Sequence, residues 1–147
     1  MNSAERNALK LENQLCFPLY ACSRAVIRQY HSALERIGLT YTQYVAMMVL
    51  WDEREISVRD LGKRLYLDSG TLTPVLKSLE SKGYVSRHRS TQDERLLIIT
   101  LTDAGEALQC EAASVPAQVG CRIGLSADEA VQLYKLLYQV LESLEAS

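Results

Sequence analysis

The sequence predicts an α+β fold that is mostly α-helical: a winged helix-turn-helix whose N- and C-terminal helices form a dimerisation region. Two helical patterns follow Ser57, and two short β patterns joined by a polar tip extend to Leu101. Helix, turn, helix and hairpin is the order of a winged helix-turn-helix, whose second helix enters the major groove of DNA. In addition, both ends of the chain carry more apolar surface than such a unit needs for its own core.

The N-terminal segment from Ala4 to Ile37 is predicted to be one long helix. It contains no glycine, and Pro18 is its only helix breaker. Its apolar residues follow helical spacing, and Gly38 provides a stop. Thr40 can then cap a second helix. Residues 44–51 of that helix, YVAMMVLW, are apolar on nearly every side, so we expect the helix at the centre of the core.

The first helix of the helix-turn-helix is expected to begin near Val58. Ser57 and Asp60 form a capping box there, and the preceding DEREI segment is predicted to be a charged turn. Asp68 or Ser69 caps the second helix, in which apolar residues again recur at helical spacing. These residues are Leu72, Val75, Leu76 and Leu79.

Gly83 should end this second helix in a left-handed conformation. If Asp68 is the cap, Pro74 lies inside the helix, so we expect a slight kink or a later start. Residues 84–89 alternate weakly, and residues 96–101 are apolar and partly β-branched, so both segments are predicted to be strands. The STQDER segment between them has no apolar residue and is predicted to be the tip of a hairpin.

After the hairpin, a helix capped by Thr102 or Asp103 should run toward Ala113, before the interruptions at Pro116 and Gly120. A second capping box then opens a last helix with a wide apolar surface. Its two residues are Ser126 and Glu129.

The excess apolar surface at both ends of the chain predicts a homodimer. Residues 1–147 would form a single domain, with dimerisation helices in 1–40 and 103–147 and the winged helix-turn-helix core in 41–102. A twofold dimer places two recognition helices about 34 Å apart and therefore binds double-stranded DNA at an inverted repeat.

Charge gives moderate support to DNA binding. Residues 57–101 contain eight Lys and Arg against five Asp and Glu, a net charge of +3, whereas the whole chain carries −2. A solvated charged face explains this balance equally well, but three arginines around an exposed tip favour phosphate binding. The candidate DNA contacts are Ser69, Thr71, Thr73, Lys77, Lys82, Arg64, Arg87 and Arg89.

Composition predicts an ordinary cytoplasmic protein. No apolar run approaches the roughly 18 residues of a membrane span, and the polar N-terminus does not resemble a signal peptide. The four cysteines are therefore expected to be thiols, and their spacings match no zinc site. We expect no metal, no cofactor and no contact with a membrane.

Cys16 is the residue with the most suggestive surroundings. A cysteine on an apolar helix face is usually inert packing, but Tyr20 and Tyr30 return to nearly the same face. Fourteen residues of helix span roughly 21 Å, so Tyr30 can reach Cys16 only of a partner whose first helix crosses antiparallel. Tyr41 could join them. Phenol hydroxyls that donate to sulfur favour the reactive thiolate, although ordinary packing explains tyrosines at this spacing as well.

Four segments carry a family resemblance: LENQLCFPLYACSR, LTYTQYVAMMVLW, LYLDSGTLTPVLKSLESKGYVSR and DERLLIITLTDAG. Over residues 11–105 the chain resembles the MarR family, and within it the OhrR repressors that sense organic hydroperoxides. The resemblance implies a dimeric repressor in which Cys16 senses the peroxide and Tyr30 and Tyr41 bind its sulfur, with Tyr20 nearby.

For the DNA-binding unit, the resemblance implies a recognition helix at about Ser69 to Lys82. It also implies that Arg95 enters the minor groove and that Asp93 braces the wing through Arg87 or Arg89.

OhrR-like proteins have either one or two redox cysteines. Cys121 stands where the resolving cysteine of the two-cysteine kind is expected, so the resemblance implies a disulfide from Cys16 to the partner's Cys121. Cys22 and Cys110 are then expected to be spectators.

Three other interpretations stay open at this point. One is a MarR-type regulator released by a small aromatic ligand without cysteine chemistry. Another is a thiol peroxidase, although no Arg, Glu or His within a helical turn of Cys16 is placed to activate a peroxide. A third is a winged helix that binds only proteins. We expect a regulator rather than an enzyme.

Overall fold

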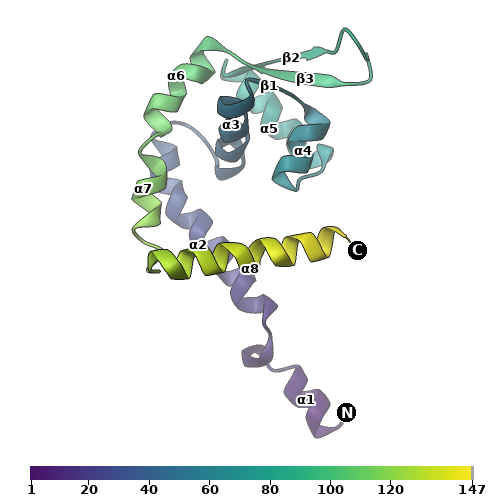
Figure 1. Cartoon of the computed structure of the whole chain (residues 1–147), viewed down its shortest axis with the longest axis vertical. Coiled ribbons are helices and arrows are strands. Elements are labelled where there is room, and N and C mark those ends of the chain that lie inside the picture. Colours follow the sequence, from purple (N-terminus) through teal and green to yellow (C-terminus); the bar gives the residue numbers. More distant parts are fainter. Residues whose placement is uncertain (147) are drawn as a thin grey trace.

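A computed structural model describes residues 1–146 of the chain (Figure 1). Its elements in chain order are α1 (Ser3–Ala8), the 3₁₀ helix η1 (Leu11–Asn13), α2 (Cys16–Glu35), α3 (Tyr41–Glu53), β1 (Glu55–Ser57), α4 (Val58–Leu65), α5 (Ser69–Ser81), β2 (Val85–Arg89), β3 (Leu97–Leu101), α6 (Asp103–Ala112), α7 (Val115–Gly120) and α8 (Ala127–Glu145).

The central elements form a winged helix-turn-helix, as predicted. Helices α4 and α5 are followed by the antiparallel hairpin of β2 and β3, which projects from the body as the wing (Figure 1). Strand β1 pairs with the other edge of β3, so the sheet order is β1-β3-β2. The prediction of a mostly helical α+β fold is confirmed.

Helix α3 lies in the core, as its sequence predicted. Thr40 caps it and forms a full capping box with Gln43. Helix α3 packs against α2, α4, α5 and α6. The largest fully buried side chains include apolar residues of α3 and of the elements around it: Leu34, Met47, Leu50, Leu61, Leu72, Leu76, Leu79 and Ile99.

The prediction of one helix from Ala4 to Ile37 is wrong. The helix is broken between α1 and α2, because two side-chain amides take over the free carbonyls at the end of α1. The Asn13 amide donates to the Asn7 carbonyl at 2.7 Å, and the Gln14 amide donates to the Ala8 carbonyl at 2.5 Å. Helix α2 then starts at Cys16, and Pro18 is tolerated because it lies in the first turn, where amide groups have no helical partner.

The DEREI segment is not simply a turn, because its end forms strand β1. Arg54 takes a left-handed conformation with φ of 67°, which reverses the chain after α3. Glu55 then pairs with Thr100, and the Arg54 carbonyl accepts a hydrogen bond from the Leu101 amide at 2.9 Å. The sequence gives little sign of this strand, because it is three residues long and depends on a distant partner.

Helix α5 starts at Ser69 with Asp68 as its cap, so Pro74 lies inside it and does not delay its start. Gly83 has a φ of 83°, and this left-handed conformation ends the helical path after α5, as predicted. Thr102 caps α6, and Pro116 lies in the first turn of the short helix α7, which follows the end of α6 at Ala112.

Helix α8 leaves its apolar side chains uncovered. Ser126 and Glu129 form the predicted capping box, yet none of its described residues is buried. The N-terminal part of the chain is exposed in the same way. The exposed large apolar residues at the two ends include Leu9, Leu11, Leu15, Phe17, Leu19, Ile27, Ile123, Leu125, Val131, Leu133, Leu136, Val140 and Leu144. Within residues 1–146, no helix is long and apolar enough to cross a membrane.

Gly105, at the start of α6, is the glycine whose replacement should cost most. A Cβ atom there would lie 2.2 Å from the Tyr84 carbonyl oxygen and 2.7 Å from a Leu101 methyl group. The Gly105 carbonyl also accepts a hydrogen bond from the Trp51 indole at 2.8 Å. Gly105→Ala should therefore lower the free energy of unfolding by about 1–3 kcal/mol, measured by urea denaturation.

Gly120→Ala provides the matched control for this prediction. A Cβ atom at Gly120 meets nothing within 4 Å, so this variant should unfold at the wild-type urea concentration. Equal midpoints for the two variants would contradict the close packing of α6 on Tyr84.

Candidate redox site and DNA-binding surface

Cys16 is the first residue of α2, and its side chain is exposed. Leu15 precedes the helix and offers no side-chain cap to its first amide groups. Cys16 therefore stands in the first turn of a helix, where the backbone amide groups have no helical partner.

Three tyrosines form a cluster at the other end of α2. The ring centroids of Tyr30 and Tyr41 are 4.9 Å apart, and Tyr44 lies 5.9 Å from Tyr30 and 6.3 Å from Tyr41. Tyr30 and Tyr41 are half-buried, whereas Tyr44 is buried and continues the contact to Trp51. The structure therefore brings together the two predicted sulfur-binding tyrosines and adds Tyr44, which sequence reasoning missed although it follows Tyr41 by three residues.

Two phenols of this cluster, those of Tyr41 and Tyr44, have a pKa above the ordinary tyrosine value. Burial raises the pKa of Tyr41 and of Tyr44, and the neighbouring Tyr30 raises both further. A protonated phenol can donate a hydrogen bond, so Tyr41 is available as a donor to an anion at its hydroxyl.

Cys16 and the tyrosine cluster belong to opposite ends of one continuous helix. Fourteen residues of helix separate Cys16 from Tyr30, which corresponds to roughly 21 Å. Tyr20 lies nearer to Cys16, but it is exposed, and its hydroxyl accepts a hydrogen bond from Arg24 at 3.3 Å. The Arg24 guanidinium also stacks over the Tyr20 ring.

Cys121 lies directly after α7 and is exposed. Its thiol donates to the Gln118 carbonyl at 3.3 Å. The next residue, Arg122, donates to the Gln29 side chain of α2 at 3.2 Å, and α7 packs along α2. The Cys121 segment therefore lies beside α2, and the Arg122–Gln29 hydrogen bond that joins the two is exposed.

Cys22 and Cys110 are also free and exposed, so all four cysteines are thiols in this structure. In the part of the chain that the structure describes, no cluster of three His, Cys, Asp or Glu side chains is arranged to hold a metal ion.

Helix α5 has a buried face and an exposed face. Leu72, Leu76 and Leu79 pack into the core, and Ser69, Thr73 and Lys77 recur four residues apart on the exposed side. The Thr73 hydroxyl donates to the Ser69 carbonyl at 2.7 Å. Thr71, which is also exposed, has its amide group bound to the Asp68 cap.

Several predicted phosphate contacts already have partners within the protein. Arg64 binds Glu53 at 2.7 Å, and Arg87 binds Glu80 at 3.0 Å. Lys82 donates to the Gly38 carbonyl at 2.5 Å, at the end of α2. Lys77 and Arg89 are exposed, and no ion pair involves them within residues 1–146.

At the wing tip, the expected partner of Asp93 is wrong. Asp93 binds Arg95, two residues along, with oxygen–nitrogen distances of 3.1 and 3.3 Å, and it also accepts from the Arg95 amide. Arg87 is unavailable to Asp93 because Glu80 of α5 holds it. The Arg95 side chain is 89% exposed, so it projects from the tip while Asp93 restrains it.

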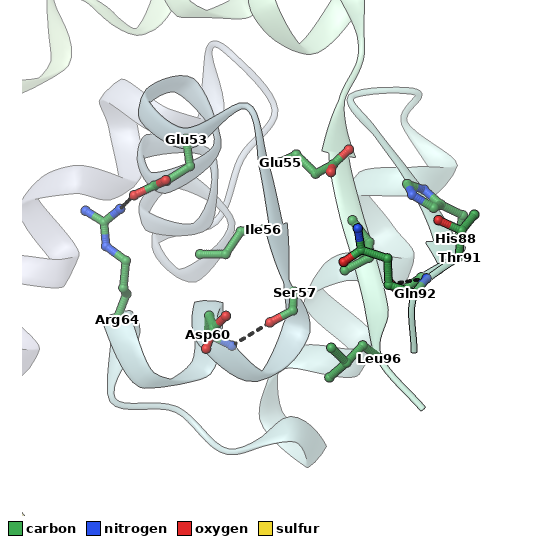
Figure 2. Close-up of a pocket in the computed structure, with 12 residues that line it drawn as sticks. Glu53, Glu55, Ile56, Ser57, Asp60, Arg64, His88, Thr91, Gln92 and Leu96 are labelled. Carbon is green, nitrogen blue, oxygen red and sulfur yellow. Dashed lines mark hydrogen bonds and ion pairs between the residues drawn. The ribbon is translucent and has the colours of Figure 1, made fainter. Parts of the chain in front are cut away.

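A polar groove of about 650 Å³ lies between β1, the start of α4 and one side of the wing, including residues 90–92 at its tip. Figure 2 shows Arg64 directed toward Glu53 on one side, and His88 and Gln92 of the wing on the other. Glu55 and Asp60 also line the groove. These carboxylates repel phosphate, so the groove is unsuited to the DNA backbone, which leaves α5 and the wing tip as the basic surface.

Comparisons with known proteins agree with this arrangement. Residues 28–111 match the family model described as transcriptional regulator SarA/Rot. The chain is 45% identical to the organic hydroperoxide resistance transcriptional regulator of Bacillus subtilis, over 92% of each chain.

Among solved structures, the chain resembles AbfR of Staphylococcus epidermidis. Overoxidized AbfR bound to DNA is 38% identical, with a TM-score of 0.77, over 95% of this chain and 98% of that one. Disulfide-formed AbfR is 36% identical, with a TM-score of 0.67, over 98% of each chain.

The ion pair of Glu80 and Arg87 connects α5 to the wing. Its contribution to the free energy of unfolding should depend on pH. The Arg87 hydrogen bond lowers the pKa of Glu80, so the pair stabilises the fold fully above the ordinary Glu pKa of about 4.3 and loses its contribution as the pH falls below it. Glu80→Gln should therefore reduce the urea midpoint at pH 7, and the difference from wild type should shrink at pH 3.5.

Glu94→Gln, whose carboxylate makes no ion pair within residues 1–146, is the control and should match wild type at both pH values. A constant difference for Glu80→Gln across this range would contradict the assignment.

Proposed function

The chain belongs to the SarA/Rot transcriptional regulators and to the OhrR type of the MarR family, and we propose that its dimer represses transcription until an organic hydroperoxide oxidises Cys16. It is a DNA-binding transcriptional regulator of the MarR/OhrR type. The redox function rests on Cys16, on the tyrosine cluster of Tyr30 and Tyr41, and on Cys121.

One observation carries the proposal: the exposed Cys16 thiol and the tyrosine cluster are at opposite ends of α2. Two α2 helices that cross antiparallel about a twofold axis would place Cys16 of each chain at the tyrosine cluster of the other. The uncovered apolar surfaces of α8 and of the N-terminal segment supply the area that such a dimer would bury. In this arrangement, residues 1–40 and 103–147 would be the dimerisation region and residues 41–102 the DNA-binding core.

In the first chemical step, the Cys16 thiolate attacks the terminal oxygen of the hydroperoxide. The O–O bond breaks, the sulfur is oxidised to sulfenic acid, and the peroxide leaves as an alcohol after it takes up a proton. Tyr30 and Tyr41 donate hydrogen bonds that stabilise the thiolate before attack.

In the second step, the thiolate of the partner's Cys121 attacks the sulfenic sulfur and displaces water, which leaves an intersubunit disulfide. Such a bond requires the two Cα atoms to come within about 7 Å. If they start farther apart, the backbone must move before the disulfide can form. The hydrogen bonds of Cys121 to Gln118 and of Arg122 to Gln29 are weak enough to break in this movement. The displacement changes the spacing of the two α5 helices, and the protein leaves its operator.

On DNA, we place α5 in the major groove and the wing tip beside the minor groove. Ser69, Thr71 and Thr73 would approach base edges or phosphates, and Lys77 and Arg89 would bind phosphates. Arg95, held by Asp93, would enter the minor groove.

Cys16→Ser tests the redox function directly. The variant should bind operator DNA like the reduced wild type but stay bound after cumene hydroperoxide, measured by fluorescence anisotropy. Release of the variant by the peroxide would refute the thiol mechanism and favour a regulator that responds to a ligand. Cys121→Ser should form no disulfide-linked dimer on non-reducing electrophoresis, whereas Cys110→Ser is the matched control and should form it normally.

The DNA-binding surface predicts different salt dependences for free and engaged cations. Lys77→Ala removes a phosphate contact, so the slope of log K against log salt should become smaller by about one. Arg64→Ala, whose guanidinium is bound to Glu53, should keep the wild-type slope. Equal changes of slope in the two variants would contradict this division of the cations.

A further inference from the structure

A cavity of about 460 Å³ lies between the C-terminal half of α2 and the start of α3. Its walls are mainly apolar, because Ile27, Leu34 and Leu39 line it. Tyr41 also lines this cavity, and the same tyrosine belongs to the cluster proposed to receive the partner's sulfur. The inference below rests on that proposed function, since it places the cavity beside the reacting O–O bond.

Three ionisable residues of α2 line the same cavity. Arg28, His31 and Glu35 follow one another along one face of the helix, together with Ile27 and Leu34. Their spacing corresponds to rises of about 4.5 Å from Arg28 to His31 and about 6 Å from His31 to Glu35. Glu35 is therefore nearest to the Gly38 end of the cavity, and Arg28 is farthest from it.

Neither Arg28 nor His31 forms an ion pair elsewhere in the described residues, and both side chains are exposed. This distinguishes Arg28 from Arg24, one helical turn earlier, which is bound to Tyr20. The cavity thus combines apolar walls, a phenol donor and a free guanidinium at the end away from Glu35.

We propose that this cavity binds the alkyl part of the hydroperoxide and that Arg28 selects hydroperoxides that carry a carboxylate, as in oxidised fatty acids. The hydrocarbon packs against Ile27, Leu34 and Leu39. The guanidinium of Arg28 holds the carboxylate by charge-assisted hydrogen bonds, and His31 donates a further one. Glu35 repels an anion at the opposite end and so sets the direction in which the substrate binds.

The carboxylate takes no part in the reaction. As in the proposed mechanism, the Cys16 sulfur is oxidised to sulfenic acid while the O–O bond breaks and an alcohol leaves. Water leaves later, when the disulfide forms. Arg28 is therefore a positioning residue, and its removal should change the choice between substrates rather than the chemistry of the sulfur.

The test compares 13-hydroperoxylinoleic acid with its methyl ester, both below their critical micelle concentrations, and uses cumene hydroperoxide as a neutral reference. Loss of the Cys16 thiol in the reduced full-length protein is followed by alkylation and intact-mass spectrometry. In the wild type, the acid should react about tenfold faster than the ester, the scale expected of a charge-assisted hydrogen bond. In Arg28→Gln this ratio should fall to about one, while the rate with cumene hydroperoxide changes less than about twofold.

Arg36→Gln is the matched control, because Arg36 caps the C-terminal end of the same helix, is exposed and does not line the cavity. It should keep the wild-type ratio, and Arg28→Glu should favour the ester. Operator binding by each reduced variant verifies that it is folded. A wild-type ratio near one, or a tenfold ratio that survives in Arg28→Gln, overturns the inference while normal oxidation by cumene hydroperoxide leaves the proposed function intact. Failure of all three hydroperoxides to oxidise Cys16 overturns both.

Discussion

The length of α2 is the constraint on which the rest of the protein depends. A helix of 20 residues is about 30 Å long, and only its C-terminal end, at Ala33 and Leu34, is buried in the core. The end that carries Cys16 is exposed and extends away from the winged helix-turn-helix (Figure 1). Because a helix cannot fold back on itself, the sulfur and the tyrosine cluster of one chain stay apart. The Tyr30 and Tyr41 cluster can therefore reach the sulfur only from a second chain, and the proposed sensor is a property of the dimer.

The C-terminal end of α2, near the tyrosine cluster, is connected to α5 by hydrogen bonds. Lys82, which follows α5, donates to the Gly38 carbonyl after α2 and to the Gln43 side chain of α3. Gln43 in turn donates to the Ser78 hydroxyl of α5 at 2.9 Å, and Gln43 is buried. A shift at the tyrosine cluster would therefore strain hydrogen bonds that fix the C-terminal end of α5. These contacts would connect the proposed oxidation of Cys16 to a change in the position of α5, the helix proposed to contact DNA.

Sequence reasoning succeeded where the deciding interaction is local. The caps Thr40, Ser57 and Ser126 each bond an amide three residues ahead, so the starts of α3, α4 and α8 could be predicted from the spacing alone. It failed where a distant group decides. The break after α1 depends on Asn13 and Gln14 turning back to earlier carbonyls, and β1 exists only because β3, more than 40 residues later, pairs with it. The tyrosines were predictable because helical spacing places them, whereas their contacts in a dimer follow from no spacing within one chain.

The net charge of residues 57–101 indicates a basic surface, but it does not show which cations are free to bind phosphate. The net charge of +3 in residues 57–101 includes Arg64 and Arg87, which are bound to carboxylates, and Lys82, which joins α2 to α5. Pairing on the protein surface contributes little free energy, yet it fixes the position of a long side chain. Arg87 therefore fixes the wing against α5 through Glu80, and the cations without an ion pair are those proposed to bind phosphate. This division would let a chain of net charge −2 present a DNA-binding segment of net charge +3 whose paired cations fix its shape, and in the proposed dimer a redox-driven shift would then change the spacing of the two α5 helices.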